Sequence, residues 1–272
     1  MDFSTVLGVV AGTLLVGGAI ITQEGYQIFF SLESLMIVVG GTVAGTMISY
    51  SFGELKKIPS LIKISLQNQN MDSSEIIDLL VDLAEKARRE GLLALEQDVA
   101  EVDDNFLQQG IQLVVDGTDP ELVRNILETK LTFLEERHNK GRNIFSTMGK
   151  LSPAFGMIGT LIGLIQMLTQ LENPDTLGPG MAIALITTLY GTLMANMIFI
   201  PLSGKLQMRS EEEILMKEVM IEGILSIQAG ENPRIVEEKL KAFLAGDEES
   251  ESENATEVEE EMAVGENAQT QE

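Results

Sequence analysis

The sequence predicts an all-α integral membrane protein with four transmembrane helices and long cytoplasmic helical extensions. Four stretches contain no Asp, Glu, Lys or Arg, and they cover residues 3–23, 34–53, 151–171 and 176–204. A helix of about 20 residues rises about 30 Å, which matches the hydrocarbon thickness of a bilayer. Outside these stretches the apolar residues recur at helical spacing, and no segment has the clear alternation that is typical of a strand.

The first two apolar stretches predict spans at about Thr5–Ile21 and Leu35–Ser51. A cleavable signal peptide is the alternative for the first stretch, but the basic region that would precede its apolar part is missing. The connection between the two spans carries Tyr26, Phe29 and Phe30, and aromatic residues are enriched at membrane interfaces. We therefore expect a hairpin of two spanning helices at the N-terminus.

The last two apolar stretches predict a second hairpin, with spans at about Leu151–Leu171 and Leu177–Leu202. All 18 Lys and Arg lie in the blocks Lys56–Lys150 and Lys205–Lys241, and the short connection inside each hairpin has none. Positive charge concentrates on the cytoplasmic side of membrane proteins. Both blocks are therefore expected in the cytoplasm, together with the N-terminus of a multi-pass protein.

Helical patterns also fill the cytoplasmic blocks. Apolar residues at helical spacing predict a helix over residues 73–89, and the same pattern continues as far as Phe106. A further helix is expected to start at Thr118 or Asp119 with Pro120 in its first turn, and it meets no stop signal before span three. After span four an apolar stripe continues in the same way, so both late spans are expected to extend into the cytoplasm.

The C-terminal end differs in composition from the rest of the chain. Residues 247–272 contain 11 acidic residues and no basic residue, and we expect this tail to be disordered because it cannot build a core. The acidic balance argues against nucleic acid as a partner. The predicted domains are residues 1–52 (spans one and two), 53–145 (cytoplasmic helices), 146–204 (spans three and four), 205–246 (cytoplasmic helices) and 247–272 (acidic tail).

Spans three and four each carry a stripe of small residues that is interrupted by hydroxyl groups. The stripe contains Gly156, Thr160, Gly163 and Met167 in span three, and Ala184, Thr188, Gly191 and Ala195 in span four, with Thr187 and Thr192 beside it. Small residues let membrane helices pack closely, and a threonine hydroxyl can bond to its own helix. The other interpretation is a polar path for a small cation. Both interpretations remain open at this point.

An ion path would need a further group from outside the chain. A hydroxyl oxygen can replace one water around a cation, but a cation in the bilayer centre also requires a carboxylate or a field of carbonyl oxygens. None of the four spans contains an acidic residue, so another polypeptide would have to supply it. Enzymatic chemistry is not indicated, because we find no glycine-rich phosphate loop, no cysteine and a single histidine. No cofactor is expected.

Three motifs together resemble a known family. They are PAFGMIGTLIGL at residues 153–164, GPGMAIALITTLYGTLMANMIFIPLSGKL at 178–206 and EKARREGLLALE at 85–96. In order and spacing they resemble the A subunits of bacterial flagellar motor stators, the MotA/PomA family within the MotA/TolQ/ExbB superfamily. The resemblance extends to about Leu244. TolQ/ExbB proteins generally have three spans, with the large cytoplasmic segment after the first, and this arrangement fits the chain less well.

The resemblance implies a complex in the bacterial cytoplasmic (inner) membrane. It would be a homopentamer around a dimer of a B-type stator subunit, which has one span with an ion-binding aspartate and a peptidoglycan-binding domain. Ion flow would be converted into torque on a switch-complex protein of the flagellar rotor. A TolQ/ExbB-like energising channel for envelope transport remains the alternative function.

The resemblance also implies roles for residues of the spans. Thr160 and Thr188 lie where sodium-type members carry threonines of the ion path, with Thr187 next to them. Because Na⁺ needs several oxygen ligands and H⁺ needs only the carboxylate, Na⁺ is favoured over H⁺ as the transported ion. Pro153 and Pro201 match prolines that couple ion flow to motion.

In the cytoplasmic block, the resemblance implies a rotor contact. Arg88 and Glu96 match the charged pair of the family that touches the rotor, and Arg89 and Glu90 lie beside them. Exposed ion pairs contribute about 1 kcal/mol or less, so such a contact can be made and broken repeatedly. From composition alone, these residues would be the solvated end of a helix.

Overall fold

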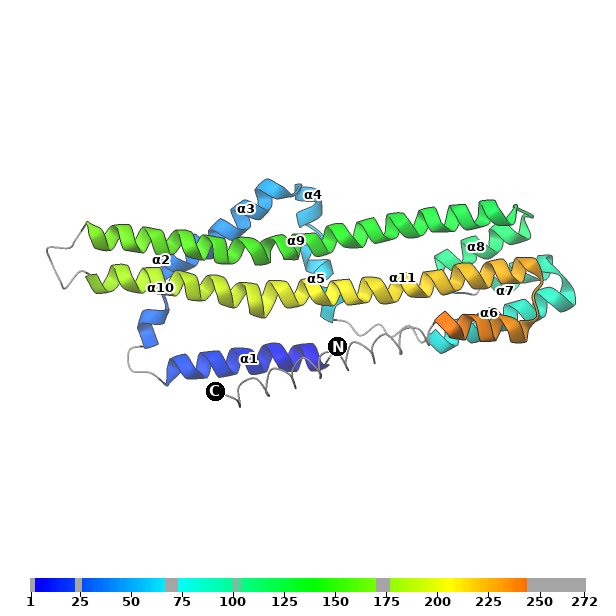
Figure 1. The fold of residues 1–272 in the computed structure, drawn as a ribbon, viewed down its shortest axis with the longest axis horizontal. Coiled ribbons are helices and arrows are strands. Elements are labelled where there is room, and N and C mark those ends of the chain that lie inside the picture. The colour runs from blue at the N-terminus through cyan, green and yellow to red at the C-terminus, as the bar shows by residue number, and fades with distance from the viewer. Residues whose placement is uncertain are drawn as a thin grey trace, which may run out of the picture. The chain divides into compact units, whose positions relative to one another are not determined.

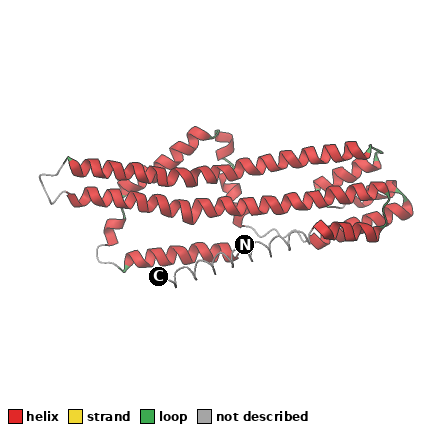
Figure 2. Cartoon of the chain, in the orientation of Figure 1, coloured by secondary structure: helices red, strands yellow, loops and turns green. Residues whose placement is uncertain are grey.

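The computed structural model describes residues 3–22, 26–66, 73–99, 102, 104–169 and 177–243 (Figure 1). All regular secondary structure in these residues is helical (Figure 2), which confirms the predicted all-α class. The predicted acidic tail lies outside the described residues. The chain forms two compact units: unit 1 comprises Met1–Gln69 and Glu135–Glu211, and unit 2 comprises Asn70–Leu134 and Glu212–Glu272. The division into five domains stays a prediction.

Among the described residues, three helical stretches are long and apolar enough to cross a membrane, and they overlap the second, third and fourth predicted spans. They are Tyr26–Ser49, Pro120–Leu168 and Leu177–Ala229. The first predicted span coincides with α1 (Phe3–Ile21). Within α1, Val10–Ile21 forms an apolar helix that is shorter than the three spanning stretches. A total of four spans therefore stays a prediction.

The first half of unit 1 is a series of short helical pieces. They are η1 (Tyr26–Phe29), α2 (Leu32–Leu35), the π-helical η2 (Met36–Gly40), α3 (Gly41–Ser49), α4 (Phe52–Leu55) and α5 (Ile58–Leu66). Ser31 caps α2 by accepting a hydrogen bond from the Ser34 amide, and Ser51 and Glu54 form a reciprocal capping box at α4. α2, η2 and α3 follow one another directly and form the second predicted span.

The second half of unit 1 is dominated by helices that belong to the last two predicted spans. α9 (Pro120–Leu168) and α10 (Leu177–Met194) run side by side in Figure 1. The predicted start of α9 is confirmed, because the Asp119 side chain accepts a hydrogen bond from the Glu121 amide at 3.0 Å. After α10 the chain continues through the π-helical η5 (Ala195–Phe199) into α11 (Ile200–Ala229).

Unit 2 contains α6 (Ser73–Glu90), η3 (Leu92–Ala94), α7 (Leu95–Val99) and α8 (Asn105–Val115). Residues 120–134 of α9, residues 212–229 of α11 and a last helix over residues 233–243 complete the unit. The helical pattern predicted to continue as far as Phe106 is interrupted. Gly91 has a φ of +90°, a conformation that only glycine adopts without strain, and it ends α6.

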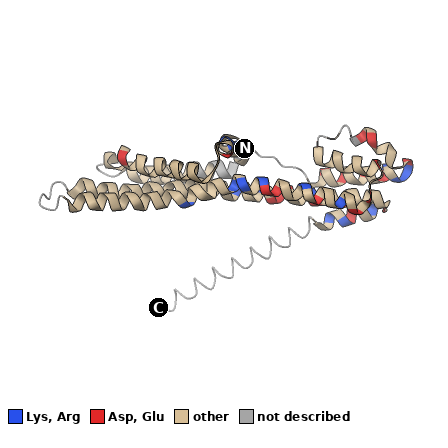
Figure 3. Ribbon diagram, turned by 90° about the horizontal axis from the view of Figure 1, so that it is seen from above, with Lys and Arg blue, Asp and Glu red and all other residues tan. Residues whose placement is uncertain are grey.

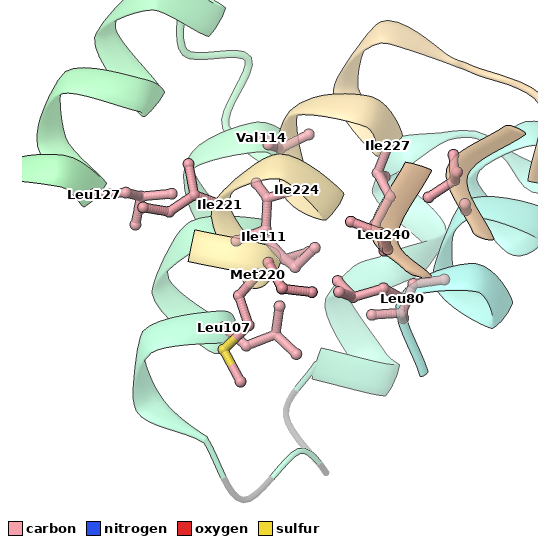
Figure 4. Packing of buried hydrophobic residues seen from close by; sticks show 14 of the residues in the cluster. Leu80, Leu107, Ile111, Val114, Leu127, Met220, Ile221, Ile224, Ile227 and Leu240 are labelled. Carbon is pink, nitrogen blue, oxygen red and sulfur yellow. The ribbon is translucent and has the colours of Figure 1, made fainter. Parts of the chain in front are cut away.

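A large aliphatic core holds unit 2 together (Figure 4). It brings together side chains from α6, α8, α9, α11 and the last helix, among them Leu80, Ile111, Leu127, Ile224 and Leu240, which are completely buried. Burying such side chains is the main force that stabilises a fold in water. Unit 2 therefore has a core of the kind that soluble domains have.

Candidate functional site

α9 and α10 touch through glycines, whose positions leave no room for a side chain. A Cβ atom on Gly163 would lie 2.6 Å from the carbonyl oxygen of Gly180, and one on Gly156 would lie 2.9 Å from that of Thr187. In the opposite direction, a Cβ on Gly191 would lie 2.7 Å from the carbonyl oxygen of Ser152. The two backbones are thus in direct contact, as expected for small residues between membrane helices. The small-residue stripes do serve packing.

The hydroxyl groups of the two stripes meet at one edge of this contact. The Thr160 Oγ1 atom lies 2.5 Å from Thr188 Oγ1 and 3.0 Å from the carbonyl oxygen of Ala184. Thr188 Oγ1 lies 3.2 Å from the same carbonyl oxygen. Two of the three threonines named from the sequence therefore share one small polar site, formed by one residue from α9 and one from α10.

This polar site can present oxygen atoms to a cation. A hydroxyl has one proton and two lone pairs, so at this short distance one of the two threonines donates to the other, and the second can donate to the backbone carbonyl of Ala184. Lone pairs then remain available on the two hydroxyls. Thr188 is exposed and Thr160 is partly exposed, so a group from another polypeptide can approach them. The site holds no charge of its own.

Thr187, the third threonine, has a different environment. Its side chain is completely buried, and its hydroxyl bonds to the carbonyl oxygens of Ile183 at 2.9 Å and Ala184 at 3.1 Å. A Cβ atom on Gly159 would lie 2.5 Å from the Thr187 methyl group, so this glycine makes room for it. The structure therefore places Thr187 inside the helix contact and not at the exposed edge.

Two more polar residues extend the line that Thr188 begins. Thr192 donates a hydrogen bond to the Thr188 carbonyl oxygen at 2.7 Å, and Asn196 donates to the Thr192 carbonyl oxygen at 2.9 Å. All three residues are exposed. They lie four residues apart and so share one face of the helix. The sequence placed Thr192 beside the stripe and missed Asn196, although its spacing of eight from Thr188 was a usable signal.

The two prolines lie at different kinds of position. Pro153 is inside α9 and packs on α10, since a Cβ on Gly191 would lie 3.1 Å from the Pro153 Cα atom. Pro201 is exposed and is the second residue of α11, which directly follows the π-helical turn η5. A proline cannot donate the backbone hydrogen bond of its turn, and this makes a bend site in a long helix.

The charged residues named from the sequence surround the end of α6. Arg88, Arg89 and Glu90 form its last turn, Gly91 ends it, and Glu96 lies in α7; the four charged residues are all exposed. Next to them, Lys86 of α6 pairs with Asp98 of α7 at 2.6 Å. Among the described residues, neither Arg88 nor Glu96 has an ion-pair partner.

A better-buried ion pair lies elsewhere in unit 2. Lys217 of α11 pairs with Asp104 at 2.5 Å, and the Lys217 ammonium lies 5.3 Å from the centre of the Phe106 ring. Asp104 also caps α8 by accepting hydrogen bonds from the amides of Phe106 and Leu107, both at 2.9 Å. Burial on its own would raise the pKa of Asp104, but the hydrogen bond and charge of Lys217 and the two amide bonds lower it.

Comparison with known proteins gives a consistent set of similarities. Residues 98–219 match the model of the MotA/TolQ/ExbB proton channel family. The chain is 45% identical to Motility protein A of Borreliella burgdorferi (strain ATCC 35210), over 90% of this chain and 94% of that protein. It is 43% identical to the uncharacterized protein YtxD of Bacillus subtilis (strain 168), over 91% and 92%. Its structure matches the flagellar MotAB stator complex from Bacillus subtilis with a TM-score of 0.82 and 33% identity, over 92% of this chain and 99% of that chain.

Proposed function

Because the chain belongs to the MotA/TolQ/ExbB proton channel family, we propose that it is the A subunit of a flagellar motor stator, which converts the flow of a monovalent cation into torque. Members of this family are channel-type membrane proteins and not enzymes. The observation that carries the proposal is the hydroxyl pair of Thr160 and Thr188 at an open edge of two packed membrane helices. Such a pair can line an ion path but cannot hold an ion alone.

A B-type partner subunit completes the proposed site. The four apolar stretches contain no acidic residue, and a cation at this depth needs a negative charge. The partner supplies an intramembrane aspartate to the edge formed by Thr160, Thr188 and Thr192, and its peptidoglycan-binding domain holds the complex to the cell wall. The stator structure from Bacillus subtilis, which is named a MotAB complex, supports a partner of this kind.

We assign the chain to the bacterial cytoplasmic (inner) membrane as a multi-pass protein with four spans. Copies of the chain form a homopentamer around the partner helices. The N-terminal helix α1, the second span and the last two spans alternate in direction, so both Lys- and Arg-containing blocks face the cytoplasm. The exposed apolar residues of α9, such as Leu161 and Ile165, face lipid or neighbouring copies.

Torque reaches the rotor through the charged end of α6. Arg88 and Glu96 contact a switch-complex protein of the flagellar rotor, with Arg89 and Glu90 assisting. The support for this assignment is that both Arg88 and Glu96 are exposed and have no ion-pair partner among the described residues. Pro153 and Pro201 provide the bend sites through which ion binding changes the shape of the long helices.

The transported ion is Na⁺ in preference to H⁺. Na⁺ loses part of its water shell in the membrane and needs several oxygen ligands, which the two threonine hydroxyls and the partner carboxylate can provide. To test this, we would measure swimming speed against external Na⁺ at fixed pH, in a host whose only stator contains this chain. A saturating rise of speed with Na⁺ is expected.

Paired substitutions test whether the threonine hydroxyl oxygens cause the dependence of swimming speed on Na⁺. Thr160→Val and Thr188→Val remove the oxygen at nearly constant shape, and each is expected to lower speed at least about tenfold at limiting Na⁺, which corresponds to about 1.4 kcal/mol. Thr160→Ser keeps the oxygen and should retain most of the speed. Thr46→Val is the matched control, because its hydroxyl bonds only to its own helix.

Two outcomes would contradict the proposed role of the threonines as ion ligands. Speed that is indifferent to Na⁺ but abolished by a protonophore would make H⁺ the transported ion and return the threonines to helix packing. An equal loss of speed in Thr160→Val and Thr46→Val would also contradict the ion-ligand role. Membrane assembly of each variant is measured in parallel, by its co-purification with the partner.

An energising channel of the TolQ/ExbB kind is the alternative, because the matching family model includes those proteins. Deletion of the gene separates the two functions. Loss of swimming with filaments still present supports the stator. Leakage of the envelope with normal swimming supports the energising channel.

A further inference from the structure

Basic residues accumulate where the helices of unit 1 leave the apolar spans. Residues 50–66, 137–150 and 200–210 contain nine Lys and Arg but one acidic residue, Glu54. In Figure 3 the spanning part of the long helices is nearly free of charged residues, and Lys and Arg follow along the same helices. Four exposed lysines near α4 and α5 form what we call the basic patch: Lys56, Lys57, Lys63 and Lys140.

The basic patch differs from five of the basic residues of unit 2. In unit 2, Lys86, Arg124, Lys217, Lys239 and Lys241 each form an ion pair with an acidic side chain. None of the four patch lysines forms an ion pair with another described residue. Their charges are therefore available to an anion from outside the chain.

Glu54, an acidic residue beside the patch, is already engaged. The Glu54 carboxylate accepts hydrogen bonds from the amide and the hydroxyl of Ser51 at 2.9 and 2.8 Å. These bonds lower the pKa of Glu54, and the charges of Lys140 and Lys57 contribute to the shift. Gly141, the neighbour of Lys140, packs against Leu61 of α5, so the patch brings together residues of α9 and of the α4–α5 segment.

α5 is amphipathic and packs firmly on one side. Its residues Ile58, Leu61 and Ile62 contact the buried cluster around Phe145, and a Cβ on Gly141 would lie only 3.1 Å from Leu61. Ile64 of α5 is 44% exposed, and Phe52 of the preceding helix α4 is 70% exposed. Large apolar side chains next to lysines are typical of helices that lie in the membrane interface.

Specific hydrogen bonds hold residues 50–66 at the ends of the spans. The Tyr50 hydroxyl donates to the Asn143 carbonyl oxygen at 2.8 Å, just before α4 begins. At the other end, Arg209 of α11 donates to the Ile64 carbonyl oxygen at 2.5 Å. The exposed apolar residues and the lysines are thus fixed at one level of unit 1, directly after the second span.

We propose that α4, α5 and the basic patch form a binding surface for anionic phospholipid headgroups of the cytoplasmic leaflet. Phe52 and Ile64 enter the boundary between headgroups and acyl chains, while Lys56, Lys57, Lys63 and Lys140 bind the headgroup phosphates. Juxtamembrane basic clusters attract anionic lipids in this way, and the attraction weakens with salt. The surface is independent of the ion path and of the rotor contact, and it requires only that residues 50–66 face the cytoplasm.

A lipid-selectivity measurement tests the surface directly. The full chain with its partner is reconstituted in vesicles of phosphatidylcholine that contain spin-labelled phosphatidylglycerol or spin-labelled phosphatidylcholine. We expect a several-fold preference of the protein for phosphatidylglycerol, reduced by added KCl. The triple variant K56Q/K57Q/K63Q should lose most of that preference.

A matched triple variant controls for net charge. K130Q/R234Q/K241Q removes the same charge from residues of unit 2, and it should leave the preference unchanged. Equal selectivity in the wild type and the K56Q/K57Q/K63Q variant would overturn the proposal, as would an equal loss in the control. Displacement of the labelled lipid by inorganic phosphate, but not by KCl of the same ionic strength, would identify a site for free phosphate and also overturn it.

The apolar part of the surface has its own test, because the chain contains no tryptophan. Phe52→Trp introduces one fluorophore, and the emission of the complex with wild-type chain is subtracted as the partner background. Quenching by brominated acyl chains is expected for Phe52→Trp and not for Leu93→Trp, another exposed position, in unit 2. Absence of quenching at Phe52→Trp would refute insertion. Both measurements work without ion flow or a rotor, so their failure would leave the stator function untouched.

Discussion

The contact between α9 and α10 and the core of unit 2 are held together in different ways. Between α9 and α10, Gly156, Gly163 and Gly191 bring backbone against backbone, and threonine hydroxyls bond across the contact. In unit 2, large side chains such as Leu80 and Ile224 fill a buried core, and ion pairs surround it. Lipid offers no hydrophobic force between helices, so close fit must replace burial there.

The two regions are therefore sensitive to different kinds of substitution. In the membrane contact, a carbon added at Gly156, Gly163 or Gly191 meets backbone atoms that cannot move aside. In unit 2, deletion of buried carbon or of an ion-pair partner is the damaging change, because a cavity or an unpaired charge remains. Each of the following predictions tests one side of this contrast.

The largest effect is expected from enlarging Gly163. A Cβ at this position would lie 2.6 Å from the Gly180 carbonyl oxygen and 2.8 Å from the Ala184 nitrogen, and both are backbone atoms. Gly163→Val should force the helices apart at a cost of about 3 kcal/mol, and swimming should be lost. The measurements are swimming speed and the thermal stability of the purified complex.

Gly178→Val is the matched control for this prediction. It lies in α10 of the same helix pair, and a Cβ there meets no atom within 4 Å. The control should keep assembly and most of the speed. If Gly163→Val were as stable and as motile as Gly178→Val, close backbone contact would not be what holds α9 to α10.

A smaller effect is expected from breaking the pair of Asp104 and Lys217. Asp104→Ala removes the ion-pair partner of a buried ammonium and the cap of α8, and it should lower the free energy of unfolding by about 2 kcal/mol. Asp104→Asn keeps a capping oxygen and should lose less. Urea unfolding of the purified chain, followed by the protection of unit 2 amides from hydrogen exchange, measures both.

The same pair predicts a pH dependence with a definite sign. The pKa of Asp104 is lowered in the folded chain, so its stabilising effect is fully present above the unfolded-state pKa of about 3.9. It is lost as the pH falls through the folded-state pKa. The stability difference between wild type and Asp104→Ala should therefore shrink in acid; a difference that stays the same at the lowest pH would contradict a contribution from the charge of Asp104.

Much of the fold could be predicted from the sequence, because its signals were local. The start of α9 was marked by Asp119 and Pro120, and the structure confirms it. The end of α6 at Gly91 was not predicted, because the apolar pattern continues across this residue. A single glycine inside a helical pattern does not indicate that its φ is positive. The two π-helical turns, η2 and η5, likewise left no signal in the residue pattern.

The candidate site was predictable where it depended on one helix face. The spacing of Thr160 and Thr188 placed each threonine on the small-residue face of its own helix, and the structure brings the two hydroxyls together. The burial of Thr187 was not predictable, because it depends on the rotation of α10 against α9. Gly159 of α9 makes room for Thr187. The burial of Thr187 is therefore determined by a residue of a second helix and not by the sequence around the threonine.

The smallest effect on stability is expected at the end of α6, although the effect on function is large there. Arg88 and Glu96 are exposed and have no ion-pair partner among the described residues, so reversing either charge should change the free energy of unfolding by less than about 1 kcal/mol. Torque should fall in Arg88→Glu and in Glu96→Arg, because each then repels its proposed partner on the rotor. Rotation of tethered cells measures the torque.

Rescue experiments separate this rotor contact from a general loss of charge. Combining each reversal with the opposite reversal on the rotor protein should restore part of the torque. The matched control is Lys130→Glu, a basic residue of unit 2 that bonds to the uncharged Gln109 and not to an acid; it should rotate as the wild type does. Wild-type torque in both reversals would remove the rotor role from these residues, and the charged end of α6 would then be only a solvated helix end, while the lysines and acids that pair inside unit 2 would keep their structural role.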